Sequence, residues 1–139
     1  MDNTLNYLAL ARKAGKAELG EEPVGAAARA LKAHLILVAS DASDHTWRRA
    51  KSFAAGTNQQ CIRIPYTKDE MGFIIGRTSL AMAAITDPAL ALGFVNALGK
   101  PETYKDAIEY LTDRTKRVRQ RQREEKAHQR NLHRRGKKK

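Results

Sequence analysis

The stretch GEEPVGAAARALKAHLILVASDAS, residues 20–43, decides how the rest of the chain folds. Pro23 suits the first turn of a helix, where a missing N–H costs nothing, and Glu21 and Glu22 favour the positive end of the helix dipole. Good helix formers dominate the residues that follow. The next run, HLILVA at 34–39, contains β-branched residues and is typical of a strand covered on both faces. The stretch therefore predicts a helix followed by a buried strand, as in a layered α/β domain.

Charge divides the chain into two parts. Its 139 residues include 26 Lys and Arg against 15 Asp and Glu, a net charge of +11. Residues 114–139, called the arm below, hold 13 of the basic residues and 2 acids, whereas residues 1–113 hold 13 of each and are neutral. A neutral body with a basic arm is typical of proteins that bind a polyanion. We expect one α/β/α domain over residues 1–99 and a basic extension over 100–139.

Segments on both sides of the opening stretch alternate between strand-like and helix-like patterns. Short apolar runs predict strands at 17–19, 61–64 and 80–85. Capping residues followed by apolar positions at spacings of three and four predict helices at about 4–14, 44–55, 68–75 and 88–98. This alternation predicts a three-layer α-β-α sandwich.

The C-terminal region favours helix, because residues 102–135 contain no Gly and no Pro. Tyr104, Ile108 and Leu111 recur at helical spacing, so the first turns are predicted to dock on the body. Repeated basic neighbours four residues apart oppose the helix further along. We expect a frayed helix that becomes ordered when phosphates neutralise it, and a disordered basic cluster at 134–139.

The composition of the arm limits what it contacts. It contains no aromatic residue, so it cannot stack on bases through aromatic rings. Its contribution is then counterion release, which is strong at low salt, blind to sequence and unable to distinguish RNA from DNA. Val118 and Leu132 are too far apart to form a heptad seam with a second copy, so we expect a monomer. The candidate phosphate contacts in the arm are Arg117, Arg119, Arg121 and Arg123.

No catalytic or metal-binding set is apparent in the sequence. The GEEPVG turn lacks the Gly-Lys-Ser/Thr ending of a P-loop, and its acids repel phosphate. The four His residues show no metal-ligand spacing with Cys61. Cys61 has no His or acid arranged with it and is expected to be a small buried hydrophobe. We therefore expect a protein that is not an enzyme and that needs no cofactor and no metal.

Two further features concern location. A single cysteine excludes an internal disulfide and fits a reducing cytoplasm. No apolar run approaches the roughly 20 residues that a membrane span needs. We expect a soluble protein of the cytoplasm with no membrane partner.

Several short motifs follow one another in a characteristic order. They are LALARKAGK at 8–16, LGEE at 19–22, LILVASDAS at 35–43, IP at 64–65, TKDEMG at 67–72, IGR at 75–77 and AITD at 84–87. Together they resemble the kink-turn-binding ribosomal protein family, which includes the archaeal large-subunit "seven-Ae" and eukaryotic "thirty-e" proteins, and in particular its small bacterial members. The resemblance covers residues 3–98 and omits the arm. It implies a mixed four-stranded sheet between helices, with an RNA surface at one end of the sandwich.

Three segments would form that RNA surface. They are the turn of Gly20, Glu21 and Glu22 with the helix after it, the turn near Asp41, and the loop at 76–80. A helix N-terminus offers backbone N–H groups to phosphate, carboxylates accept hydrogen bonds from guanine edges, and a loop covers unstacked bases. The loop contributes Arg77, Thr78 and Ser79.

The chain departs from the family pattern in the first of these segments. Family members that grip sheared G·A pairs usually carry Gly-x-Asn-Glu, with a Lys three residues beyond the Glu. Here Glu22, Pro23 and Ala26 stand at the Asn, Glu and Lys positions. Substitutes with a positive charge lie further along, at Arg29 and Lys32.

Lys13 and Lys16 follow the first predicted helix and have two interpretations. They either favour the negative end of the helix dipole and solubilise the surface, or they contact RNA. Two functions also stay open for the whole chain. One is an RNA-binding protein associated with the ribosome or ribosomal RNA. The other is a protein–protein adaptor on the same fold, anchored to ribosomes or nucleic acid by the arm.

Overall fold

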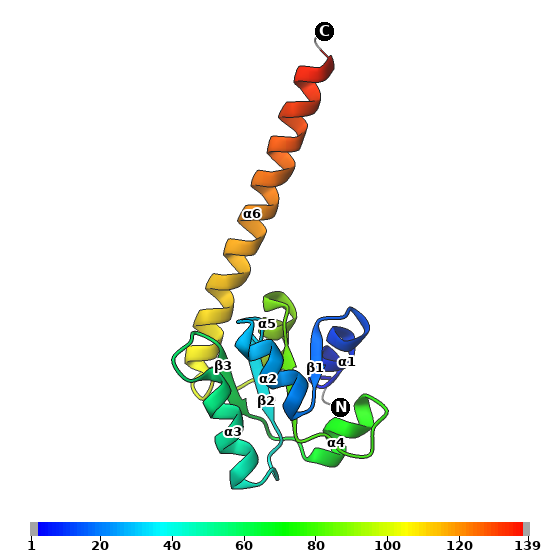
Figure 1. The fold of residues 1–139 in the computed structure, drawn as a ribbon, viewed down its shortest axis with the longest axis vertical. Coiled ribbons are helices and arrows are strands. Elements are labelled where there is room, and N and C mark those ends of the chain that lie inside the picture. Colours follow the sequence, from blue (N-terminus) through cyan, green and yellow to red (C-terminus); the bar gives the residue numbers. More distant parts are fainter. Residues whose placement is uncertain (1–2, 138–139) are drawn as a thin grey trace.

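The computed structural model describes residues 3–137, and side chains as far as residue 132. A mixed four-stranded sheet lies between helices, as the sequence predicts, and a long helix leaves the body (Figure 1). In chain order the elements are α1 (Asn6–Lys13), β1 (Ala17–Leu19), α2 (Glu21–Arg29), β2 (Leu35–Val38), α3 (Asp44–Ala54), β3 (Gln60–Arg63), α4 (Lys68–Ile74), β4 (Met82–Ile85), α5 (Pro88–Ala97) and α6 (Lys105–Lys137).

The strand directions define two ends of the sheet. The strand order is β1-β4-β2-β3, with β2 parallel to β3 and β4 antiparallel to both of its neighbours. Strands β1, β2 and β3 therefore finish at the same end, where β4 begins. We call this the loop end, because the turns at 20–22, 39–43, 64–67 and 75–81 lie there. The opposite end, where β1, β2 and β3 begin and β4 finishes, is called the arm end.

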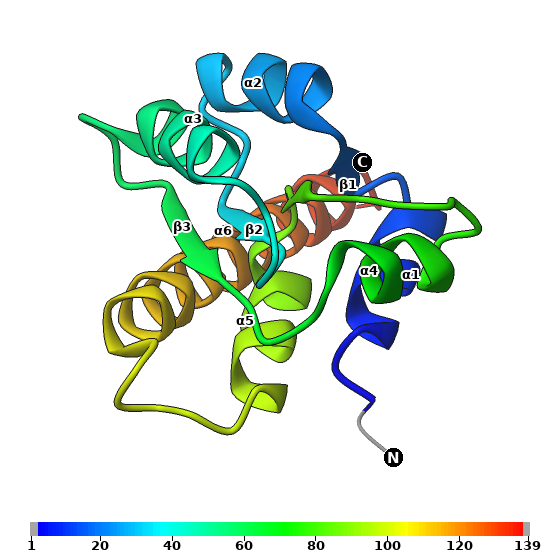
Figure 2. The same cartoon turned by 90° about the horizontal axis from the view of Figure 1, so that it is seen from below.

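Each face of the sheet is covered by a different set of helices, α2 and α3 on one side and α1, α5 and α6 on the other (Figure 2). The four residues of β2 are all buried and alternate between the two cores. Leu35 and Leu37 belong to the larger core, with Phe94 of α5. Ile36 and Val38 belong to the smaller core under α2 and α3. A strand buried on both faces reads as a continuous apolar run, which is why the pattern at 34–39 was informative.

Helix starts follow local capping chemistry. The hydroxyl of Ser43 accepts a hydrogen bond from the N–H of Thr46, 3.2 Å away, at the start of α3. Thr67 and Glu70 form the predicted capping box of α4. The carboxylate of Asp87 accepts from the N–H of Leu90 at 2.9 Å, with Pro88 as the first residue of α5. These caps confirm the predicted starts of α4 and α5.

The C-terminal region differs from the prediction at its far limit. Tyr104 and Leu111 are buried in the larger core together with Ala107, so the start of α6 docks on the body as their helical spacing predicts. The helix then continues to Lys137, which includes the first four residues of the cluster at 134–139 that was predicted to be disordered. The rest of that prediction lies outside the described residues.

Candidate nucleic-acid interface

Backbone hydrogen bonds tie the turns of the loop end together. The N–H of Gly20 donates to the carbonyl of Met82 at 2.9 Å, which fixes the turn before α2 against the start of β4. The N–H of Ala39 donates to Ala81 at 3.0 Å, and the N–H of Ser40 donates to Tyr66 at 2.8 Å. The three segments predicted to share an RNA surface therefore lie at one end of the sheet, held by main-chain contacts that do not depend on side-chain type.

Asp41 connects two of these turns through its side chain. Its Oδ1 accepts a hydrogen bond from the backbone N–H of Lys68, the first residue of α4, at 2.8 Å. The carbonyl of Lys68 in turn accepts from the N–H of Leu80 at 3.0 Å. Asp41 therefore positions the α4–β4 loop, because a carboxylate at a helix N-terminus satisfies a free N–H and favours the helix dipole. This leaves one of its oxygens for an external donor.

Two glycines determine the shape of the loop end. Gly20 has φ 96°, a left-handed value that a side chain would strain, and this value lets the chain turn from β1 directly into α2. Gly72 lies inside α4, where an added Cβ would come within 2.7 Å of the backbone nitrogen of Ser79 and 2.9 Å of the carbonyl oxygen of Arg77. The loop at 76–80 therefore packs directly on the backbone of α4.

The side chains that the sequence predicts for RNA contact at the loop end are exposed, and their charged members are mostly acidic. Glu22, Arg77, Thr78 and Ser79 are exposed, as is Glu21. Glu21 is also paired with Arg49 of α3, with 2.8 Å between the carboxylate and the guanidinium nitrogen. The predicted set at this end thus contains three acids and one arginine. It presents hydrogen-bonding groups on a fixed backbone but has little net attraction for phosphate.

Three lysines of the predicted site lie elsewhere, at the arm end. Lys16 precedes β1, and its carbonyl accepts from the N–H of Thr86, just after β4. Lys32 follows α2, where Leu31 with φ 59° turns the chain out of the helix. Lys16, Lys32 and Thr86 line one groove of about 570 Å³. Lys13 ends α1, three residues before Lys16. Pro23 and Ala26 line the same groove, so Lys16 and Lys32 share it with the first turns of α2. Contact of these lysines and of Lys13 with RNA stays a prediction.

Arg29 is the last residue of α2 and is exposed, whereas Gly20 caps the first turn. Its side chain points back along the helix, because its guanidinium lies 3.4 Å from where a Cβ at Gly25 would be, next to Ala26. Its role as a substitute for the Lys typical of position 26 stays a prediction.

Helix α6 crosses the body from the loop end to the arm end. Near its start the hydroxyl of Tyr104 donates to the carbonyl of Arg63, at the finish of β3, over 3.1 Å. Two turns later the hydroxyl of Tyr110 lies 3.2 Å from Nδ1 of His34, just before β2 begins. The helix then projects away from the loop end (Figure 1).

The protonation of His34 is linked to this docking. Burial lowers the pKa of His34 below its ordinary value of 6.5, and the charge of Arg114 lowers it further, while Asp87 acts in the opposite direction. The neutral imidazole is therefore favoured where α6 leaves the body.

Beyond the body, α6 presents a basic stripe along one face. The stripe consists of exposed cations at intervals of three and four residues, so successive members lie about 5–6 Å apart within an arc of about 80°. Its members are Lys116, Arg119, Arg123, Lys126 and Arg130. The arm's two acids, Glu124 and Glu125, fall outside that arc.

The four arginines that the sequence predicts in the arm do not share a face. Arg119 and Arg123 belong to the basic stripe, whereas Arg117 and Arg121 lie on the opposite side of the helix. Arg117 is also paired with Asp113 at 3.1 Å. Alternate residues of a helix point about 200° apart, so the predicted set divides into two pairs.

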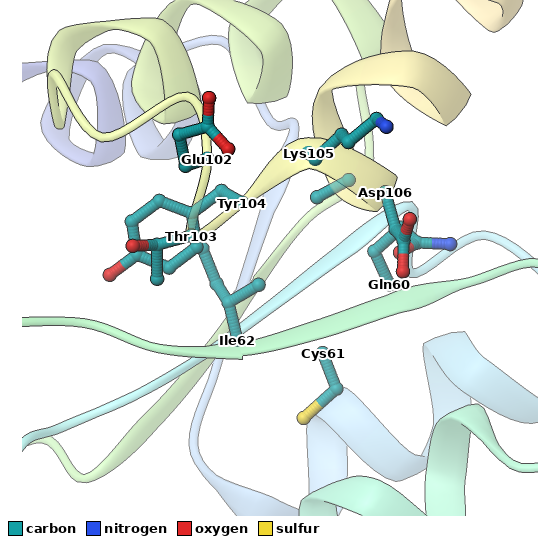
Figure 3. A pocket seen from close by; sticks show the side chains of 9 residues that line it. Gln60, Cys61, Ile62, Glu102, Thr103, Tyr104, Lys105 and Asp106 are labelled. Carbon is teal, nitrogen blue, oxygen red and sulfur yellow. The ribbon is translucent and has the colours of Figure 1, made fainter.

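A polar pocket of about 340 Å³ lies between β3 and the start of α6 (Figure 3). Cys61 lines it, but its side chain points to the other side of β3 from Ile62 and Tyr104. Burial raises the pKa of Cys61 to about 12, so its thiol stays protonated and is a poor nucleophile at neutral pH. Figure 3 shows Glu102 and Asp106 among the side chains that line the pocket, and none of its nine lining residues is a histidine.

Within residues 3–137 there is no group of three or more His, Cys, Asp or Glu side chains that could hold a metal ion. None of the helices in that part of the chain is both long enough and apolar enough to cross a membrane.

The fold is thus an α/β/α sandwich with its turns gathered at one end and a basic helix leaving the other. No family model matches the chain, and no curated protein matches its sequence. Solved structures do resemble the fold. A protein of unknown function from Bacillus halodurans is 20% identical, with a TM-score of 0.65 over 71% of this chain and 99% of the other. The 15.5kD RNA binding protein of Giardia lamblia is 19% identical, with a TM-score of 0.58 over 71% of this chain and 84% of the other. At these identities the likeness establishes the fold.

Sequence reasoning missed two features of this interface. Gly72 was not singled out in the sequence, although an isolated Gly inside a helical pattern costs stability relative to Ala and so can signal a packing constraint. The basic stripe was overlooked because neighbours four residues apart were considered only as repelling pairs. Its spacing is visible in the sequence once the helix is known to continue.

Proposed function

We propose that this protein binds structured RNA, with the loop end selecting the RNA and the arm attracting its phosphates. The observation that carries the proposal is the separation of charge: a neutral body holds exposed hydrogen-bonding turns on a rigid backbone, and the whole net charge of +11 belongs to the arm. The fold it shares with the RNA binding protein of Giardia lamblia supports the proposal.

Each part has the chemistry for its proposed role. At the loop end, Thr78, Ser79 and the acids offer donors and acceptors to base edges and to 2′-hydroxyls, which distinguish RNA from DNA. The arm contributes affinity through counterion release and has no means of reading sequence. Glu22, Pro23 and Ala26 replace the side chains typical of kink-turn recognition. The proposal therefore does not specify the structure of the RNA, which is to be identified by selection from a pool.

The proposal is tested by comparing the full chain with a synthetic peptide of residues 114–139. Filter binding over a salt series should give similar salt slopes for the two, because the same cations release counterions. The full chain should bind structured RNA much more tightly than perfectly paired duplex, and the peptide should not distinguish them. If the full chain discriminates no better than the peptide, the proposed role of the body is wrong.

Ribosomal RNA is the first structured RNA that we propose as the partner. The motif order that resembles ribosomal RNA binders is the reason for this choice. Co-sedimentation of the tagged protein with ribosomal subunits at moderate salt checks it. If the protein stays at the top of the gradient but still binds free RNA in filter assays, it binds RNA and the ribosome is not its partner.

An adaptor role is the second candidate, and one surface favours it. Phe73 of α4 is 84% exposed and lines an open groove of about 450 Å³ with Leu5 and Ile74. Substituting both Glu22 and Arg77 discriminates between the candidates. Unchanged RNA selectivity in that double variant favours the adaptor, and lost selectivity favours recognition by the loop end.

A further inference from the structure

The two surfaces proposed to contact RNA lie at opposite ends of the molecule. The loop end is where β1, β2 and β3 finish, and α6 leaves the body at the other end (Figure 1). Near that exit, Thr115 and Arg119 of α6 line a small pocket with Asp87, which follows the last residue of β4 by two positions. The arm therefore begins one sheet length, about 13 Å, from the loop end and points further away.

The arm is also long relative to the body. Residues 116–137 form about 33 Å of helix, and side chains from Arg119 to the last one described, Leu132, are all exposed. The far part of the arm is thus roughly 40 Å from the loop end. An RNA element seated on the loop end would have to extend about 13 Å along the body to reach the start of the basic stripe and roughly 40 Å to follow it to its far part.

The basic stripe has a defined chemistry of its own. It holds five cations on one face and no acid. A single-stranded segment gains much of its affinity by stacking bases on aromatic rings, and residues 114–139 contain none. A double helix keeps its bases stacked and presents phosphates in rows, so it matches a straight row of charges without aromatic help.

We infer that the protein joins two RNA segments, one held at the loop end and a double-helical one lying along the basic stripe of α6. The inference rests on the proposed function and adds that the two surfaces are occupied at the same time by different segments, of one RNA or of two. Among the predicted lysines, Lys16 lies near the exit of α6, because its carbonyl accepts from the N–H of Thr86, the residue before Asp87.

Simultaneous binding is the property that tests the inference. The full chain is immobilised and saturated with an RNA duplex of mixed sequence, about two helical turns long. A pool of RNA stems with a randomised internal loop is then added at moderate salt. We expect pool members to be retained while the duplex stays bound. Displacement of the duplex, or no retention until the duplex is removed, shows one shared site and overturns the inference while leaving RNA binding intact.

Matched pairs of substitutions assign each ligand to its surface. Arg119→Gln with Arg123→Gln removes two charges from the stripe, and Arg117→Gln with Arg121→Gln removes two from the opposite face of the same helix. The first pair should weaken duplex binding about tenfold or more, and the second pair less than about threefold. Equal losses would show that only total charge matters and would contradict the stripe.

A loop-end variant completes the design. Arg77→Ala with Ser79→Ala should abolish retention of the pool and leave duplex binding unchanged, with unaltered far-ultraviolet circular dichroism as the folding control. If the full chain retains no pool member even without duplex, the proposed function and this inference are both wrong. If the loop-end variant loses both ligands together, the inference alone is wrong.

Discussion

The loop end and the arm differ in nearly every physical respect. The loop end is nearly rigid by construction: four turns are joined by backbone hydrogen bonds, and Asp41 and Gly72 position the loop that carries Arg77. In the arm, the side chains from Arg119 to Leu132 are all exposed, and 13 basic residues and 2 acids make up more than half of residues 114–139. The loop end has a defined surface but little net attraction for phosphate. The arm attracts phosphate strongly but has little defined surface. Selectivity and affinity are therefore expected to respond to different substitutions.

The largest expected effect comes from removing the charge of the arm. Replacing the five members of the basic stripe with Gln keeps good helix formers and lowers the charge by five. RNA affinity at low salt should fall about a hundredfold or more, and the slope of log K against log salt should become shallower by about 4. Filter binding over a salt series measures both. An unchanged slope would show that the stripe does not contact phosphates.

A stability change of comparable size is expected where the arm joins the body. Leu111 is fully buried in the larger core, so Leu111→Ala should lower the free energy of unfolding by about 2–5 kcal/mol through lost burial and a cavity. Leu132→Ala, on the exposed part of the same helix, is the matched control and should change it by less than about 0.5 kcal/mol. Urea denaturation measures both variants. If both substitutions change the free energy of unfolding by a similarly small amount, α6 is not part of the core.

These junctions also show what the sequence could reveal. Pro23, the Thr67 capping box and the Asp87–Pro88 pair act within one turn of helix, so local chemistry was enough to place three helices. That the turns near Gly20, Asp41 and Arg77 lie together was predicted from the order of motifs, which resembles that of a known family. Hydrophobic patterning also identified β2, because a strand buried on both faces leaves a continuous apolar run.

Distance along the sequence does not show direction in space. Lys16 is four residues from Gly20, but β1 carries the chain from one end of the sheet to the other between them. The docking of Tyr104 and Leu111 was predicted from their helical spacing, and both are buried. The far extent of α6 was missed because repulsion between like charges four residues apart is a weak guide to where a helix ends.

A smaller effect tests the rigidity of the loop end. Gly72→Ala would place a Cβ against the backbone of Arg77 and Ser79, so the loop must shift. We expect a loss of about 1–3 kcal/mol in stability and lost selectivity for structured RNA, with the salt slope unchanged. Phe73→Ala, on the exposed side of the same helix, serves as the control and should keep both. Retained selectivity in the Gly72 variant would show that the loop does not select RNA.

The smallest effect concerns pH. Folding lowers the pKa of His34, so the folded chain binds fewer protons at this residue than the unfolded chain does. The neutral imidazole therefore contributes to the free energy of unfolding, and this contribution is fully present above the ordinary pKa of 6.5. Stability is therefore expected to decline as pH falls from about 6.5 through the lower folded pKa. His34→Gln should flatten the decline measured by urea denaturation, and His45→Gln on exposed α3 should not. An equal decline in the His34 variant would remove this residue as the cause.

The division of labour between the two ends is tested most directly by a ratio of affinities. For the full chain and for the variant with five Gln substitutions in the stripe, binding is measured to one selected structured RNA and to a perfect duplex of equal length, at each salt concentration. We expect the variant to lose absolute affinity for both while its preference for the structured RNA remains or increases. A preference that falls to one in the variant would mean that the arm, and not the loop end, selects the RNA.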